Sequence, residues 1–183
     1  EGFNSSTLLR SLSYSVALSM RQAQVYGVSV RESAAGSGVF AQGYGVYFGN
    51  SGLVDSTHYL LFADANGNGQ YAAGEELPRY TLGNGKGTDY LIKNFCAHSI
   101  VSGDQCRTGT GTTIDFLTVY FRRPNPDACF ATSVSTAACA AGASPVYDYA
   151  YVQIKTFTGA DYRTIKISST GQIAVCKLNL DSA

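Results

Sequence analysis

The period of the apolar residues changes abruptly near Gly36, and this change constrains the fold more than any other feature. Up to Arg31, apolar residues recur at steps of three and four, the period of one helix face. They are Leu9, Leu12, Val16, Met20, Ala23 and Val30. No proline interrupts the segment, and Gly36 and Gly38 end the pattern. We therefore expect one long amphipathic helix over residues 5–31.

The remaining positions of this helix are expected to be mostly polar. Ser11, Ser15, Ser19 and Gln22 fall on its polar side. Gly27 weakens the helix by about 1 kcal/mol relative to alanine.

After Gly38, short apolar and aromatic runs alternate with clusters of Gly, Asn, Asp, Ser and Pro, a pattern typical of β-strands and turns. The expected strands are 39–48, 57–63, 79–82, 89–95, 112–122, 128–132, 148–156, 162–168 and 172–177. Because no helical segment separates them, neighbouring strands should pair antiparallel. The expected fold is α+β: a single domain over 1–183 in which the helix packs on an antiparallel β domain at about 39–177.

The charge balance gives no broad attraction to nucleic acid or to anionic lipid. The chain has 13 Lys plus Arg against 13 Asp plus Glu, for a formal net charge of zero. No run approaches the roughly 18 consecutive apolar residues of a membrane helix. The chain is therefore expected to be soluble. Arg122 and Arg123, which precede a proline, could form a small local basic patch, with a solvated strand end as the alternative.

Five cysteines lack the spacing of a zinc site. Cys96 and Cys106 flank one short polar loop, and Cys129 and Cys139 flank another. Two local disulfides, formed in an oxidising compartment, are the favoured interpretation. Reduced core thiols and other pairings are the alternatives. Cys176 would remain as a free or intermolecular thiol.

The sequence from Asp64 to Glu75 matches the calcium-loop pattern D-x-[DN]-x-[DN]-G-x5-E. The expected ligands are side-chain oxygens of Asp64, Asn66 and Asn68, the backbone carbonyl of Gln70 and both carboxylate oxygens of Glu75. A strand rather than an EF-hand helix precedes the loop, and only two ligands are carboxylates, so Ca²⁺ affinity would be about millimolar. The alternative is a polar turn whose side chains bond their own backbone.

The sequence contains little evidence of a catalytic or nucleotide-binding motif. The G-x-S-x-G elbow of serine hydrolases is absent, and His58 and His98 are interpreted as ordinary surface histidines. The loop 83–88 lacks the spacing of a phosphate-binding loop and is expected to be a hairpin loop. Tyr44, Tyr47, Tyr147, Tyr149 and Tyr151 could present an adhesive face, although plain sheet packing is commoner. We expect a non-enzymatic protein.

Several short segments, taken in order, resemble the type IV pilin and pseudopilin superfamily, with most similarity to the minor pseudopilins of type II secretion. They are LSYSVALSMRQAQVYGVSV at 12–30, YGVYF at 44–48, FADANGNG at 62–69 with GEEL at 74–77, FRRPNPDA at 121–128 and RTIKISSTGQI at 163–173. The family's prepilin cleavage site and apolar segment of about 20 residues are not in this sequence. We expect this chain to be the soluble part of such a subunit, with its N-terminal membrane helix missing.

The resemblance implies a structural subunit of a pilus-like or pseudopilus filament, anchored in the inner membrane before assembly and displayed outside the cell. Other pilin or pseudopilin subunits would be its partners, through the helix face at Leu9, Leu12, Val16 and Met20. The alternative is a stand-alone secreted binding or adhesion module for a glycan, a surface or DNA.

Overall fold

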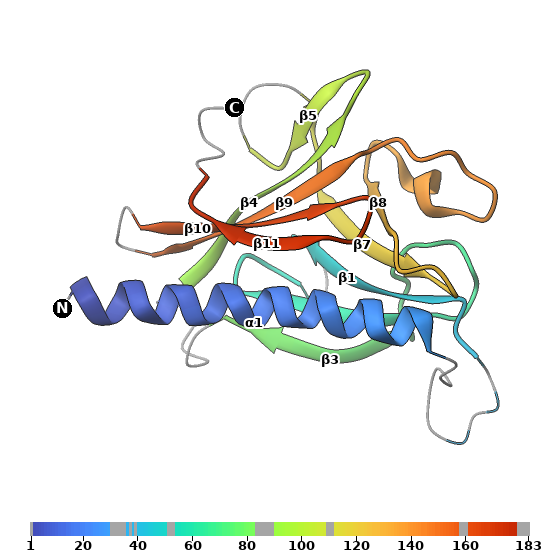
Figure 1. The fold of residues 1–183 in the computed structure, drawn as a ribbon, viewed down its shortest axis with the longest axis horizontal. Helices are drawn as coiled ribbons and strands as arrows, with labels where there is room; N and C mark the ends of the chain where they lie inside the picture. Colours follow the sequence, from blue (N-terminus) through green and yellow to red (C-terminus); the bar gives the residue numbers. More distant parts are fainter. Residues whose placement is uncertain are drawn as a thin grey trace.

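The structure is a computed structural model that describes residues 2–29, 36, 38, 40–50, 54–82, 90–108, 112–157 and 161–178. It has one N-terminal helix, α1 (Gly2–Val28), packed on two β-sheets (Figure 1). This combination of one helix with antiparallel-rich sheets confirms the expected α+β class. The β domain consists of two sheets.

The first sheet has five strands and lies along the C-terminal half of the helix (Figure 1). Its order is β3 (Glu76–Thr81), β2 (His58–Asp64), β1 (Gly43–Gly49), β7 (Phe116–Arg122) and β8 (Ala128–Thr132). All its pairings are antiparallel. The central pair, β1 with β7, joins segments about 70 residues apart in the chain, a contact that no local pattern could indicate.

The second sheet has six strands. Its order is β11 (Ile173–Cys176), β10 (Tyr162–Ser168), β9 (Tyr149–Thr156), β4 (Tyr90–Ser99), β5 (Gly103–Cys106) and β6 (Thr112–Thr113). Strand β9 shows the period of two: Ala150, Val152 and Ile154 are fully buried in the core, and the residues between them face the other side. All pairings are antiparallel except the short one between β5 and β6, which is parallel.

The helix contacts both sheets, because it packs on β1 and β7 of the first and on β9, β10 and β11 of the second. Leu9, Val16, Met20 and Ala23 are fully buried in the hydrophobic core that the helix shares with both sheets. Gly27 packs against Phe121 of β7. The side chain of Gln24 donates to the backbone carbonyls of Pro126 and Gly171, at 2.8 and 3.2 Å.

Several sequence expectations need correction. Ser19, expected on the polar side of the helix, is buried with its hydroxyl 3.0 Å from that of Tyr59. The helix ends at Val28, and residues 30 and 31 lie outside the described part of the chain. The expected strand 112–122 is divided at Ile114 and Asp115 into β6 and β7. Strand β5 was not expected.

Candidate functional site

The loop between β2 and β3 contains the sequence that matches a calcium loop. Asp64, the last residue of β2, is fully buried. Its Oδ1 accepts the backbone N–H of Gly67 at 2.7 Å, and its Oδ2 accepts that of Gly69 at 2.9 Å. The carboxylate therefore organises the first half of the loop through backbone amides.

Glu75 closes the second half of the loop in the same way. Its Oε1 accepts the N–H of Ala65 at 3.0 Å and its Oε2 that of Ala72 at 2.9 Å. Burial raises the pKa of the Glu75 carboxyl, and the charge of Asp64 adds to the increase. Two largely buried carboxylates thus lie within electrostatic reach of each other.

The two asparagines complete a chain of side-chain-to-backbone hydrogen bonds. Asn66 Oδ1 accepts the N–H of Asn68 at 3.0 Å, and Asn68 Oδ1 accepts the N–H of Gln70 at 2.8 Å. These are the bonds of the polar-turn interpretation. Each carboxylate oxygen has a second lone pair, so the same oxygens could also ligate a cation. Among the described residues, no group of three or more His, Cys, Asp or Glu side chains could hold a metal ion.

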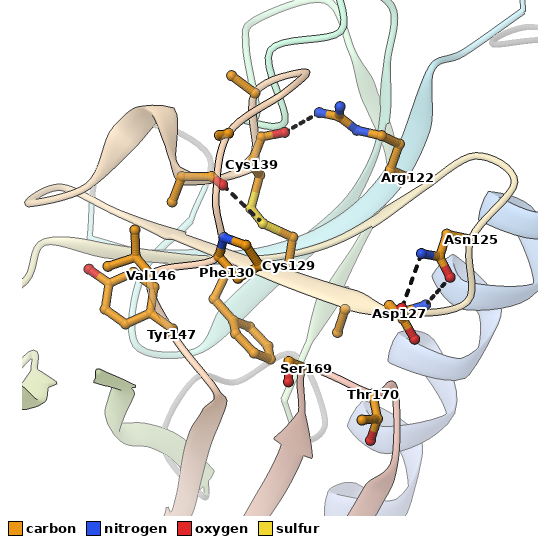
Figure 2. A pocket seen from close by; sticks show the side chains of 15 residues that line it. Arg122, Asn125, Asp127, Cys129, Phe130, Cys139, Val146, Tyr147, Ser169 and Thr170 are labelled. Atoms are coloured by element: carbon orange, nitrogen blue, oxygen red, sulfur yellow. Dashed lines mark hydrogen bonds between the residues drawn. A yellow bond between two sulfur atoms is a disulfide. The ribbon is translucent and has the colours of Figure 1, made fainter. Parts of the chain in front are cut away.

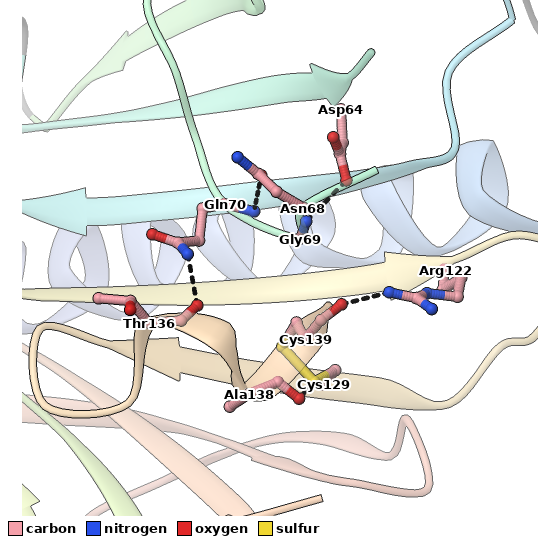
Figure 3. Close-up of a disulfide and its surroundings, with 9 residues drawn as sticks. All are labelled: Asp64, Asn68, Gly69, Gln70, Arg122, Cys129, Thr136, Ala138 and Cys139. Atoms are coloured by element: carbon pink, nitrogen blue, oxygen red, sulfur yellow. Dashed lines mark hydrogen bonds between the residues drawn. A yellow bond between two sulfur atoms is a disulfide. The ribbon is translucent and has the colours of Figure 1, made fainter. Parts of the chain in front are cut away.

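This loop is tied to the Cys129–Cys139 disulfide (Figure 3). Gln70 Nε2 donates to the carbonyl of Thr136 at 2.5 Å. Gly69 has φ +72°, and a Cβ there would lie 2.5 Å from the Cβ of Cys139, so only glycine fits. Loop 64–75 and the short helix η1 (Thr136–Cys139) therefore form one packed unit.

Both expected disulfides are confirmed. Cys96 and Cys106 face each other across β4 and β5, with a Cα–Cα distance of 4.1 Å. Cys129 on β8 is bonded to Cys139 at the end of η1, with a Cα–Cα distance of 5.6 Å. Cys176 is a free, partly buried thiol. Its Sγ lies 3.4 Å from the carbonyl oxygen of Thr164.

A pocket of about 370 Å³ lies beside the second disulfide and was not anticipated (Figure 2). Its apolar lining includes Phe130, Val146 and the two half-cystines of that disulfide. Asp127 and Thr170 belong to its polar lining, contributed by the segment before β8 and by the β10–β11 turn. Three separate segments of the chain build the pocket, so its position could not be predicted from the sequence. The ten-residue spacing of Cys129 and Cys139 was the one sequence signal near it.

The expected assembly face of the helix is not free in the folded domain. Leu9, Val16 and Met20 are fully buried in the chain's own core, and Leu12 is partly buried against it. The most exposed large apolar side chains of the helix are instead Tyr14 (58%), Leu18 (68%) and Val25 (58%). Their spacings of four and seven residues place them on one side, opposite the buried face.

Arg122 and Arg123, the residues of the expected basic patch, both donate to backbone carbonyls. The guanidinium of Arg122 donates to the carbonyl of Cys139, as Figures 2 and 3 show. That of Arg123 donates to the carbonyl of Ala41 at 3.2 Å. Arg122 is the last residue of β7, whereas Arg123 belongs to the turn that follows, and their guanidinium groups contact different segments.

Each histidine is partly exposed and lies beside a carboxylate. His58 Nδ1 is 2.8 Å from Asp55 Oδ1, and His98 Nδ1 is 2.6 Å from Asp104 Oδ1. Burial works to raise the pKa of Asp55, but hydrogen bonds from His58 and Thr57 outweigh it and lower that pKa to about 2.

The proposed adhesive tyrosines do not share one exposed surface. Tyr44, Tyr147 and Tyr151 are buried, whereas Tyr47 and Tyr149 are partly exposed. The three buried rings therefore fit the alternative interpretation, in which the tyrosines pack within the sheets. The loop 83–88, considered for phosphate binding, lies outside the described residues.

Comparisons with known protein families, with curated proteins and with solved structures give no match. Within the described residues, no helix is both long enough and apolar enough to cross a membrane.

Proposed function

We propose that this chain is a structural subunit of a type IV pilus-like or pseudopilus filament that assembles through α1 and displays its β domain outward. The observation that carries the proposal is the exposed row Tyr14, Leu18 and Val25, on a helix whose opposite side is packed into the chain's own core. Apolar side chains on the outward side of a packed helix offer a surface for a second partner.

The composition of the helix favours packing against other helices. Gly2–Val28 contains no acidic residue, and its only charged residues are Arg10 and Arg21. At 1.5 Å per residue, its 27 residues span about 40 Å. Helices of this kind pack by fitting rows of side chains into the grooves of a neighbour. The partners would be other copies of this chain or related subunits.

The two disulfides support placement in an oxidising compartment, such as the cell exterior. In the proposed mechanism, a membrane segment encoded before Glu1 holds the subunit in the inner membrane until it joins the filament. Sequencing the gene upstream of Glu1 tests this part directly. An apolar segment of about 20 residues there would support the filament subunit, and a cleavable signal peptide alone would favour the secreted module.

Cysteine cross-linking on the exposed helix row tests assembly. In a Cys176→Ser background, which removes the free thiol, Leu18→Cys should give disulfide-linked dimers under mild oxidation because the helices of two copies meet there. Val134→Cys is the matched control, since Val134 is 51% exposed but follows strand β8. Equal dimer yields from the two variants would refute helix-mediated assembly between copies of this chain.

The second candidate is a stand-alone secreted binding or adhesion module, and the pocket beside Cys129–Cys139 is the observation that favours it. Its volume of about 370 Å³ is in the range of small-ligand sites. A glycan array probed with the wild-type chain and with Ala143→Phe, which would fill the pocket, tests this candidate. Binding that Ala143→Phe abolishes would support it. DNA binding is less favoured, because the formal net charge of the chain is zero.

We also propose that loop 64–75 binds Ca²⁺ weakly through Asp64, Asn66, Asn68, Gln70 and Glu75. Support comes from the two adjacent carboxylates, whose mutual repulsion a cation would relieve. A bound ion would stiffen the loop that packs on η1 and so stabilise the outward surface.

A further inference from the structure

Loop 64–75 contains two consecutive Asn-Gly pairs, Asn66–Gly67 and Asn68–Gly69. A pair of this kind can lose ammonia without an enzyme, because the backbone nitrogen of the glycine attacks the side-chain carbonyl carbon of the asparagine. Glycine hinders this approach least, since it has no Cβ. Both asparagines are exposed, so water reaches them. The third such pair of the chain, Asn84–Gly85, lies outside the described residues.

The reaction consumes only water and involves no redox step. A bond forms between Cγ of the asparagine and the glycine nitrogen, which gives up its proton to solvent. The bond from Cγ to the side-chain nitrogen breaks, and this nitrogen takes up a proton and leaves as ammonia. Water then opens the resulting succinimide ring on one side or the other of its nitrogen, which gives aspartate or isoaspartate.

Asp64 holds both of the glycine nitrogens that would attack. Its Oδ1 accepts the N–H of Gly67 at 2.7 Å, and its Oδ2 accepts that of Gly69 at 2.9 Å; Figure 3 shows the second of these bonds. Attack requires each nitrogen to lose its proton and to carry negative charge. A fully buried carboxylate at hydrogen-bond distance opposes that charge, and little solvent screens the repulsion.

The side-chain carbonyl groups that would be attacked are also held. Asn66 Oδ1 accepts the N–H of Asn68 at 3.0 Å, and Asn68 Oδ1 accepts the N–H of Gln70 at 2.8 Å. Each carbonyl is therefore fixed by the residue two positions further on. Both reacting groups of each pair are engaged elsewhere, so the closed loop disfavours the reaction.

We propose that Asn66 and Asn68 are deamidation sites that the Asp64 carboxylate keeps closed, and that they react only when the loop opens. The two sites differ in what opening breaks. Gly69 is buried, and a Cβ there would lie 2.5 Å from the Cβ of Cys139, whereas Gly67 is half-buried beside the side chain of Gln42. Local opening is easier where fewer packed contacts are lost, so Asn66 should deamidate faster than Asn68.

Deamidation to aspartate changes the charge of the calcium-loop pattern. The pattern would then have carboxylates at positions 64, 66, 68 and 75 in place of two carboxylates and two amides. A higher ligand charge increases Ca²⁺ affinity. This consequence alone rests on the proposed Ca²⁺ binding, because the protection by Asp64 follows from hydrogen bonds of the ion-free loop.

Deamidation rates measured by peptide mapping with mass spectrometry test the inference. The folded chain is incubated at mildly alkaline pH with excess chelator, and a second sample is unfolded in urea. Asn66 and Asn68 of the folded wild type should react at least about tenfold more slowly than in the unfolded chain, and Asp64→Ala should lose most of this protection. Asn125 is an internal control, because it is exposed but Pro126 after it has no N–H to lose.

Glu75→Ala is the matched variant, because the Glu75 carboxylate accepts the amides of Ala65 and Ala72 instead of the two glycine amides. Its rates should stay close to those of the wild type. Equal acceleration in Asp64→Ala and Glu75→Ala would overturn the inference, since general loosening of the loop would then explain both. An unchanged or slower rate in Asp64→Ala would also overturn it, the slower rate by making Asp64 a general base for the attack.

Two further variants keep the inference falsifiable. If Asp64→Ala does not fold, Asp64→Asn removes the charge and keeps one acceptor oxygen, and its rates should lie between those of the folded and the unfolded wild type. Rates equal to those of the folded wild type would reject the role of the carboxylate. Asn66→Asp/Asn68→Asp should show a larger calcium-induced rise in melting temperature than the wild type. A rise in neither protein would reject calcium binding and leave the protection by Asp64 to the rate measurements.

Discussion

A Cβ on Gly27 of α1 would lie 2.8 Å from the carbonyl oxygen of Phe121 on β7. Helix propensity alone predicts that Gly27→Ala stabilises the chain by about 1 kcal/mol. The close approach reverses this expectation, because a backbone carbonyl in a central strand cannot move away easily. We expect Gly27→Ala to lower the free energy of unfolding by about 1–3 kcal/mol, the usual effect of overpacking.

Urea denaturation measures this effect, with Ser15→Ala as the control. Ser15 is exposed on the same helix, and its alanine variant should show a gain of a few tenths of a kcal/mol from helix propensity. A stabilising Gly27→Ala would mean that the helix does not pack this closely on β7.

Tyr59 on β2 connects the helix to the first sheet through the hydroxyl pair with Ser19. Burial raises the pKa of the Tyr59 phenol to about 12, although the Ser19 hydrogen bond works in the opposite direction. The folded state therefore favours the neutral phenol. This contribution to stability is complete below pH 10, the ordinary value, and is lost as the pH rises through about 12.

Tyr59→Phe should separate these two effects. At pH 8 the variant should lose about 0.5–1.5 kcal/mol of unfolding free energy with the hydrogen bond. Between pH 10 and 12 its stability should fall less steeply than that of the wild type, because one titrating group is absent. Urea denaturation series at several pH values provide the measurement. Parallel pH profiles for both proteins would contradict the assigned pKa of Tyr59.

The sequence was most informative where the signal is local. Strands 128–132 and 162–168 match β8 and β10 to the residue, and both disulfides join cysteines ten residues apart. Strand β5, with sequence GDQC, escaped prediction because its polar residues resemble a loop and its pairing with β4 depends on the disulfide and the sheet.

Long-range features could not be predicted in the same way. The helical period identified the buried residues Leu9, Val16 and Met20, but it could not tell whether their partner was the chain's own core or another subunit. The inward position of Ser19 depends on Tyr59, which is 40 residues away. The loop 64–75 was found from its pattern alone, whereas its packing on Cys139 required the fold.

The two disulfides should differ in their effect on the candidate calcium loop. Replacing either pair with serines should cost about 2.5–3 kcal/mol of unfolding free energy, by the chain-entropy estimate for loops of this length. Only Cys129→Ser/Cys139→Ser removes the anchor against which Gly69 packs. Hydrogen exchange at the Gly67 and Gly69 amides should therefore accelerate beyond the global change in that variant alone. Equal acceleration in Cys96→Ser/Cys106→Ser would show that the loop does not depend on its neighbouring disulfide.

Calcium should raise the melting temperature of the chain, and the effect should depend on Asp64 and Glu75. With a dissociation constant of about 1 mM, 10 mM Ca²⁺ would add roughly 1.4 kcal/mol, or about 3–6 °C for a domain of this size. Asp64→Ala should abolish the increase. Glu76→Gln is the matched control, because Glu76 is the adjacent but exposed carboxylate, bonded to Tyr71 and Gly74 instead.

The pH dependence of the calcium effect gives a stricter test of the same site. Because the folded pKa of Glu75 is raised, its neutral form stabilises the ion-free chain below the ordinary value of 4.5, and this contribution is lost as the pH rises through the raised value. Calcium binds the ionised form, so the increase in melting temperature should be small below pH 4.5 and grow above the raised pKa. Melting curves with calcium and with excess chelator across this range provide the measurement. A concentration of 10 mM Ca²⁺ is about ten times the expected dissociation constant. If the melting temperature does not change at this concentration and neutral pH, Asp64 and Glu75 serve only to hold the loop through their hydrogen bonds to backbone amides.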